Sequence, residues 1–181
     1  MGKRYPLLSE PLMAFIQKQR VFFVATAGPS GRVNLSPKGM DTCRVLDPGR
    51  IIWLNVTGSG NETAAHLLQN SRMTLMFCAF EGSPMILRVY GQAKTILPGH
   101  PIWENLYASF PALPGARQIF DLEIDLVQTS CGMGVPSFDF QSERTALNEW
   151  AQKKGADGLQ QYWLSRNQAS LDGNEAPIPI S

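Results

Sequence analysis

The chain has 181 residues, of which 44% are hydrophobic and 17% are charged, and its formal net charge is +1. This length and composition are typical of a globular protein with one sizeable core and exclude an intrinsically disordered chain. The near-neutral charge, without runs of basic residues, argues against binding to nucleic acid or to an anionic membrane surface.

Cysteine usage and hydropathy predict a cytoplasmic protein. The three cysteines include no CxxC pair, so they suggest neither a disulfide framework nor a zinc site. No stretch approaches the roughly 18 consecutive apolar residues that a membrane helix needs, and the start of the chain does not have the pattern of a signal peptide. We therefore expect no membrane partner and no bound metal.

The first part of the chain predicts one helix and then a series of strands. Ser9 is a candidate N-cap for a helix that continues to about Arg20. The segments that follow are rich in β-branched and aromatic residues and are separated by turn residues. The predicted strands are VFFVATA (21–27), RVNLS (32–36), CRVLD (43–47) and RIIWLNV (50–56).

The second part continues the same alternation and ends in helices. Asn61 is a candidate cap for a short helix over 62–69, and Gly91 indicates a bulge or a close backbone approach inside a long strand. The predicted strands are RMTLMFCAF (72–80), MILRVYGQAKTIL (85–97) and RQIFDLEIDLVQTS (117–130). Further helices are predicted over 101–110, 142–154 and 157–168.

These elements predict a mainly β fold. Hairpin-length connections favour an antiparallel sheet of about six strands over a parallel sheet with crossover helices. Closure into a barrel with peripheral α-helices would remove exposed strand edges. No repeat or break in composition divides the chain, so we expect a single domain over 1–181, with 137–181 as a helical C-terminal extension.

The segment TGSGNET (57–63) is the first candidate site. Free backbone amides at a helix N-terminus, together with the positive end of the helix dipole, favour a phosphate. Two glycines would let the backbone approach an anion, and Ser59, Asn61 and Thr63 would add side-chain donors. No Walker pattern follows. The sequence leaves two interpretations open, a structural turn and an anion site.

Basic residues in neighbouring segments extend this candidate site. Lys38, in VNLSPKGM (33–40), would either neutralise a phosphate or remain a solvated turn lysine. Arg88 and Arg117, both in predicted strands, would either pair with carboxylates or contact a ligand. The late stretch YWLSRNQASLDG (162–173) would pack either on a partner subunit or on its own domain.

The order of these blocks carries a family resemblance. VFFVATAGPSGRVNLSPKGM, IIWLNVTGSGNETAAHL, RMTLMFCAF and ILRVYGQA together resemble the FMN-binding split-barrel proteins related to pyridoxamine 5'-phosphate oxidase, over about residues 10 to 130. The resemblance implies a six-stranded antiparallel split β-barrel that forms a homodimer, with FMN bound at the subunit interface.

The resemblance also implies site residues. Lys38 falls on the lysine of a run that lies along the flavin in the family, and Gly60 and Asn61 replace the Arg-Lys pair that grips the FMN phosphate there. Asn55 falls near a position that touches the flavin. The candidate cofactor-binding residues are Asn34, Leu35, Ser36, Lys38, Asn55, Gly58, Ser59, Gly60, Asn61, Thr63 and Arg88.

The resemblance implies an FMN-binding oxidoreductase that transfers electrons to or from a small substrate or a nicotinamide donor. No catalytic residue is identified. The alternatives are a non-catalytic flavin- or haem-binding protein for storage or sensing, and a reductase that uses coenzyme F420. The end of the chain, SLDGNEAPIPIS (170–181), lacks the Arg and His of the oxidase's substrate motif, so pyridoxine phosphate oxidation is not expected.

Overall fold

The structure, a computed structural model, describes residues 2–179. Its elements in chain order are β1 (Lys3–Tyr5), α1 (Glu10–Lys18), β2 (Phe22–Thr26), β3 (Asn34–Lys38), β4 (Cys43–Asp47), β5 (Arg50–Val56), α2 (Glu62–Gln69), β6 (Arg72–Cys78), β7 (Ile86–Ile96), α3 (Trp103–Tyr107), β8 (Ala116–Ser130) and α4 (Ala146–Arg166). No helix in this part of the chain is both long and apolar enough to cross a membrane.

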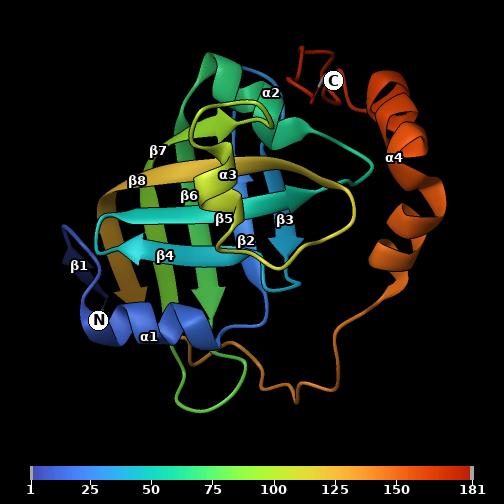
Figure 1. The fold of residues 1–181 in the computed structure, drawn as a ribbon. Coiled ribbons are helices and arrows are strands. Elements are labelled where there is room, and N and C mark those ends of the chain that lie inside the picture. The colour runs from blue at the N-terminus through green and yellow to red at the C-terminus, as the bar shows by residue number, and fades with distance from the viewer. Residues whose placement is uncertain (1, 180–181) are drawn as a thin grey trace.

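All the strands join in one antiparallel sheet, in the order β3-β2-β6-β7-β8-β5-β4, with β1 paired to the far part of β8. Strands β4 and β5 cross in front of β2, β6 and β7, so the sheet curls round on itself (Figure 1). The end strands β3 and β4 do not pair, so the barrel is split. The predicted fold class is confirmed, although the sheet has eight strands where about six were expected.

The core lies inside the curled sheet and under α1. Phe22 packs between Phe77, at a ring-centroid distance of 5.8 Å, and Trp53, at 6.2 Å. Leu12 and Ile16 of α1 are buried against the same cluster. Each such side chain contributes about 1.5–3 kcal/mol when it is buried, so the alternation of apolar residues along the strands selects the inner face.

The predicted irregularity at Gly91 is confirmed. The pairing of β7 with β8 shifts register between Tyr90 and Gly91. A Cβ on Gly91 would lie 1.9 Å from the backbone oxygen of Glu123, a distance that real structures do not tolerate. Only glycine therefore allows the two strands to approach this closely.

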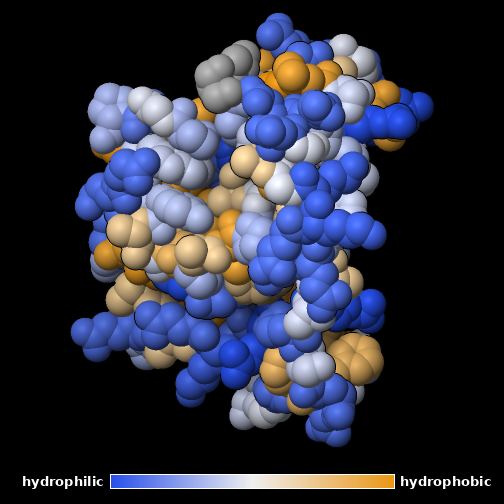
Figure 2. Space-filling view, turned by 45° about the vertical axis from the view of Figure 1, so that its right-hand side comes forward, coloured by the Kyte–Doolittle hydropathy of each residue, from blue (hydrophilic) through white to orange (hydrophobic). Residues whose placement is uncertain are grey.

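The C-terminal part forms one long element at the side of the sheet. The two helices predicted for this region meet in α4, which changes direction at Gly155 (φ 67°). A long extended segment connects β8 to α4, and the chain after α4 returns toward α2 (Figure 1). In Figure 2, hydrophilic side chains cover the outer surface of α4, and a hollow lies beside it.

Candidate functional site

A cavity of about 290 Å³ lies where β3, β5 and β8 meet the loop that precedes α2. Nine of the eleven predicted cofactor-binding residues line it: Asn34, Ser36, Lys38, Asn55, Gly58, Ser59, Gly60, Asn61 and Thr63. Val56, Glu62 and Arg117 complete the lining. We refer to this set of residues as the cation cavity, because its charges are dominated by Lys38 and Arg117.

The register of β3 explains which of its residues reach the cation cavity. Lys38 is paired with Phe22 of β2, whose side chain is buried in the core. Directly opposed residues of an antiparallel pair share a face, so Asn34, Ser36 and Lys38 point to the inner side.

Leu35 and Arg88 lie on the opposite face of the sheet. Strand alternation turns Leu35 outward, where it is 63% exposed. Arg88, on β7, donates to Ser130 Oγ at 2.9 Å and lies on that same outward face. Within one chain, the structure therefore does not bring these two predicted residues to the cation cavity.

Arg117 is the strongest feature of the cavity, and the list of predicted binding residues did not include it. In the pairing of β5 with β8, Asn55 opposes Gln118 and Val56 opposes Ala116, so Arg117 is the extra residue of a bulge. Bulges re-aim side chains and are common beside functional sites. An arginine next to the apolar start of a predicted strand was the available sequence signal, but the bulge that directs it depends on strand pairing.

The guanidinium of Arg117 is buried and largely unpartnered. The residue is 1% exposed, and its Nη2 donates to Gly60 O at 3.0 Å. Its Nε and Nη1 have no hydrogen-bond partner among residues 2–179, and burial lowers its pKa to about 10. A buried charge without a partner is costly, so this arginine indicates a missing anion.

Lys38 adds a second cation to the same cavity. Burial, and then the charge of Arg117, lower the pKa of Lys38 to about 8. Its Nζ lies 5.3 Å from the ring centroid of Trp53, within the range of a cation–π contact. No ion pair among the described residues involves Lys38 or Arg117.

The loop before α2 contributes free backbone donors. The N–H groups of residues 58–63 have no hydrogen-bond partner among residues 2–179. The carbonyls of Gly58 and Ser59 accept from Asn167 Nδ2 at 3.2 and 3.4 Å, and that of Gly60 accepts from Arg117. Unpaired amides at the start of a helix form a site suited to a phosphate or carboxylate.

Two side chains of this loop, those of Asn61 and Glu62, do not offer free hydrogen-bond donors to the cavity. Asn61 Nδ2 donates to Asn167 O at 3.1 Å and to Pro177 O at 3.0 Å, so the prediction that Asn61 adds a side-chain donor is wrong. The carboxylate of Glu62, which would repel an anion, accepts from Leu171 N at 2.9 Å. Thr63 Oγ1 accepts from Asn34 at 3.3 Å, which leaves the Thr63 hydroxyl free to donate.

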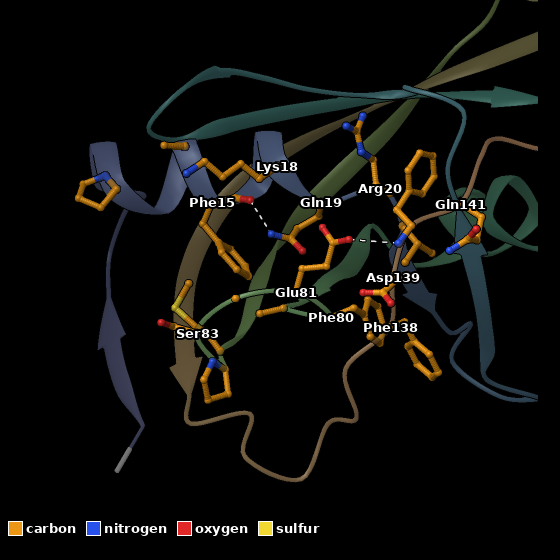
Figure 3. A pocket seen from close by; sticks show the side chains of 18 residues that line it. Phe15, Lys18, Gln19, Arg20, Phe80, Glu81, Ser83, Phe138, Asp139 and Gln141 are labelled. Atoms are coloured by element: carbon orange, nitrogen blue, oxygen red, sulfur yellow. Dashed lines mark hydrogen bonds between the residues drawn. The ribbon is translucent and has the colours of Figure 1, made fainter.

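A second and larger cavity has a different chemistry. It measures about 1070 Å³ and lies between α1, the turn after β6 and the segment 138–141 (Figure 3). Its walls include the rings of Phe15, Phe80, Phe138 and Phe140, and Glu81 anchors one wall by accepting from Phe140 N at 3.1 Å. It shares no lining residue with the cation cavity, and its aromatic walls do not suit a phosphate.

A split antiparallel barrel with a cavity lined by two cations beside its end strand β3 is the class of protein that these features define. Residues 8–131 match the family model for pyridoxamine 5'-phosphate oxidase. The pyridoxamine 5'-phosphate oxidase family protein ustO of Aspergillus flavus is 35% identical over 187 aligned residues, which cover 93% of this chain and 75% of that protein. The chain therefore belongs to the pyridoxamine 5'-phosphate oxidase family.

Solved structures share the fold at low sequence identity. A candidate pyridoxamine 5'-phosphate oxidase from Lactobacillus delbrueckii gives a TM-score of 0.54 with 21% identity, covering 68% of this chain and 94% of that one. HupZ from Group A Streptococcus gives 0.53 with 17% identity, covering 66% and 91%. These similarities extend over about two thirds of the present chain and support the split-barrel architecture alone.

Proposed function

We propose that this protein is an FMN-dependent oxidoreductase whose cation cavity binds the phosphate of the cofactor. The observation that carries the proposal is Arg117, a buried guanidinium with two nitrogens that no described residue bonds, beside a second cation and a run of amides without partners in residues 2–179. A phosphate would satisfy all three groups at once, because it accepts several hydrogen bonds and carries negative charge. Membership of the family supports a flavin as the molecule that bears this phosphate.

The residues of the cavity would divide the work of binding. Arg117 and the amides of 58–63 would hold the phosphate, and the hydroxyls of Ser59 and Thr63 would add donors. Lys38 would place positive charge beside the bound anion. When bound, the flavin would supply the electron-transfer chemistry, and the protein would supply binding, orientation and electrostatics.

A haem is less well supported than a flavin. His66 is 2% exposed, and its Nδ1 lies 3.0 Å from Thr26 Oγ1. His100 is exposed, and its Nδ1 accepts from Ile102 N at 3.4 Å. Neither histidine lines the cation cavity, and a haem would need an axial ligand directed at it.

We also propose that two copies associate and cover the rest of the cofactor. A cavity of 290 Å³ is at the small end of ligand pockets, so it has room for the phosphorylated end of a flavin and not for the whole molecule. Leu35, which the family resemblance places near the cofactor, and Arg88, a candidate ligand contact, lie on the outward face of β3 and β7. In a homodimer that uses this face, they would border the cofactor from the partner side.

The test compares FMN with riboflavin, which lacks only the phosphate, by flavin fluorescence titration of the cofactor-free protein. We expect the wild type to prefer FMN and Arg117→Met to lose at least tenfold in FMN affinity, because hydrogen bonds to charged groups contribute about 1.5–3 kcal/mol. Riboflavin affinity should not change. The apo unfolding temperature of Arg117→Met should be equal or higher, because a buried unpaired charge is removed.

The matched control is Arg72→Met, since Arg72 is an exposed arginine outside the cation cavity. Equal binding of FMN and riboflavin by the wild type would contradict the phosphate assignment. Bleaching of the bound flavin by NADPH would support an oxidoreductase, whereas flavin that no donor reduces would indicate a binding protein. A Soret band would indicate haem instead of FMN, and selective binding of F420 would indicate F420 as the cofactor.

A further inference from the structure

The chain after α4 packs against the loop that precedes α2, although more than a hundred residues separate the two in sequence. The C-terminal end lies beside α2 in Figure 1. Trp163 Nε1, in the last turn of α4, donates to Thr57 Oγ1 at 2.7 Å. Gln118 Nε2 donates to Pro177 O at 2.6 Å, and Asp172 pairs with Arg32. Asn61 and Glu62 of the loop also bond to Pro177 and Leu171, so this docked segment, residues 163–178, contacts the loop along its length.

Asn167 is the centre of this contact. It is 0% exposed and occupies the C-cap position of α4, where its N–H bonds to Trp163 O at 2.9 Å. Its side-chain amide donates to the carbonyls of Gly58 and Ser59, and its own carbonyl accepts from Asn61 Nδ2. One buried residue thus contacts three of the four loop residues between Thr57 and Glu62.

These bonds determine which backbone groups of the loop remain free. Each peptide group has one donor and one acceptor, and a carbonyl that is held on one side keeps the plane of its peptide from turning over. The carbonyls of Gly58 and Ser59 are held by Asn167, and that of Gly60 by Arg117, so the neighbouring amides stay available to a ligand.

The loop needs such support because it is intrinsically flexible. A Cβ added to Gly58 would meet nothing within 4 Å, so the packing does not restrict this residue. A Gly-Ser-Gly segment loses much conformational entropy when it is ordered. Without an external restraint, its carbonyls could turn toward the cavity and repel an anion.

We propose that Asn167 is a positioning residue for the anion site, and that docking of the segment 163–178 assembles this site. The inference rests on the proposed function for the identity of the ligand. Asn167 itself touches no reacting atom. It acts through the loop, because holding the Gly58 and Ser59 carbonyls keeps the amides of residues 59 and 60, in the same peptide planes, directed away from its own side chain.

The test uses Asn167→Leu, which keeps the side-chain size and removes the amide, with Asn174→Leu as the matched control. Asn174 lies on the same segment, and its side chain makes no hydrogen bond with the described residues. Dissociation constants for FMN and riboflavin are measured by fluorescence titration. We expect Asn167→Leu to lose about tenfold or more in FMN affinity, since two bonds to the loop disappear, with riboflavin affinity unchanged.

A second readout does not involve flavin. Inorganic phosphate should raise the unfolding temperature of the wild type, compared with chloride at equal ionic strength, and this rise should vanish in Asn167→Leu. A wild type that responds to phosphate but does not bind FMN would contradict the proposed function alone. A variant that responds to phosphate and FMN as the wild type does would overturn the positioning role.

Trp163→Phe supplies a milder variant if Asn167→Leu does not fold. It removes the N–H that donates to Thr57 Oγ1 and shortens the ring but keeps an aromatic side chain, and we expect a smaller, phosphate-specific loss of affinity. Equal losses for FMN and riboflavin in both variants would indicate a general structural role and overturn the proposal. A wild type that binds neither phosphate nor FMN would overturn both proposals.

Discussion

Arg117 and Lys38 are held in one cavity although neither forms an ion pair with a carboxylate of residues 2–179. Elsewhere in the protein, buried charges are paired, as in the contact of Arg50 Nε with Asp121 at 2.8 Å. Among residues 2–179, the unfavourable electrostatic arrangement is therefore confined to the cation cavity. Such an arrangement is expected where a ligand supplies the opposite charge, because binding relieves the unfavourable electrostatic energy.

The lowered pKa of Lys38 makes ligand binding depend on pH. A bound anion stabilises the protonated amine, so it raises the pKa of Lys38 above the value of about 8 in the free protein. We expect FMN affinity to be constant below pH 8 and to fall above it, by at most about tenfold per pH unit for one linked proton. Titrations of FMN between pH 6 and about pH 9.5 measure this dependence.

The same shift has a consequence for stability with a definite sign. Between about pH 8 and the ordinary lysine pKa of 10.5, the unfolded chain binds a proton that the folded chain lacks. The contribution of Lys38 to the free energy of unfolding therefore rises with pH across this window and is lost as pH falls to 8. Lys38→Met should abolish the pH dependence of FMN affinity and this contribution to the pH dependence of the free energy of unfolding. The exposed control Lys153→Met should keep both. An unchanged pH profile in Lys38→Met would remove Lys38 from the site.

Among the elements, the strands combine regular alternation with three shifts of register, in the pairs β4–β5, β5–β8 and β7–β8, and the last two have distinct roles. The bulge in β8 directs Arg117 into the cation cavity. The bulge at Gly91 lets β7 and β8 approach closely. Gly91 was recognisable in the sequence because glycine is rare inside a strand. The bulge at Arg117 could not be recognised in the sequence, because it depends on how β5 and β8 pair.

Gly91→Ala should destabilise the protein by about 3 kcal/mol or more, because the new Cβ would force β7 and β8 apart. The clash is with the backbone of Glu123, which cannot rotate away as a side chain can. Urea-induced unfolding followed by tryptophan fluorescence measures the difference. Gly134→Ala is the control, since its Cβ would meet nothing within 4 Å. Equal stability of the two variants would show that the strands can separate at this point without cost.

At the scale of the whole molecule, one face of the sheet remains uncovered. Val33 and Leu35, on the outward side near β3, are 72% and 63% exposed. Phe23, Met76 and Tyr90 lie on the same face of neighbouring strands, which makes a partly apolar surface next to the split of the barrel. Such a surface is expected to bind another protein, and a second copy is the partner that the proposed function requires.

Leu35→Glu should therefore convert a dimer into a monomer and weaken FMN binding in parallel, because a buried unpaired carboxylate is costly. Size-exclusion chromatography with light scattering measures the mass. Leu46→Glu is the control, since Leu46 is 40% exposed on β4, at the other end of the strand order. A wild type that is monomeric while it binds FMN tightly would contradict the proposed assembly.

Local sequence properties are sufficient to predict the helices and strands and the place of the loop before α2. Strand alternation, the helix over 62–69 and the close approach at Gly91 all follow from the properties of neighbouring residues, and the structure confirms them. The family resemblance located nine residues of one cavity for the same reason, since Lys38 and Ser59 belong to short, recognisable segments.

Which polar groups can bind a ligand depends on the folded chain. Arg117 reaches the cavity through a bulge, and Asn61 gives its donors to the chain after α4. Each outcome depends on partners that are distant in sequence, and a hydrogen-bonding group's availability is set by what has already bound it. A sequence pattern records the group itself, whereas the folded chain determines whether that group is occupied.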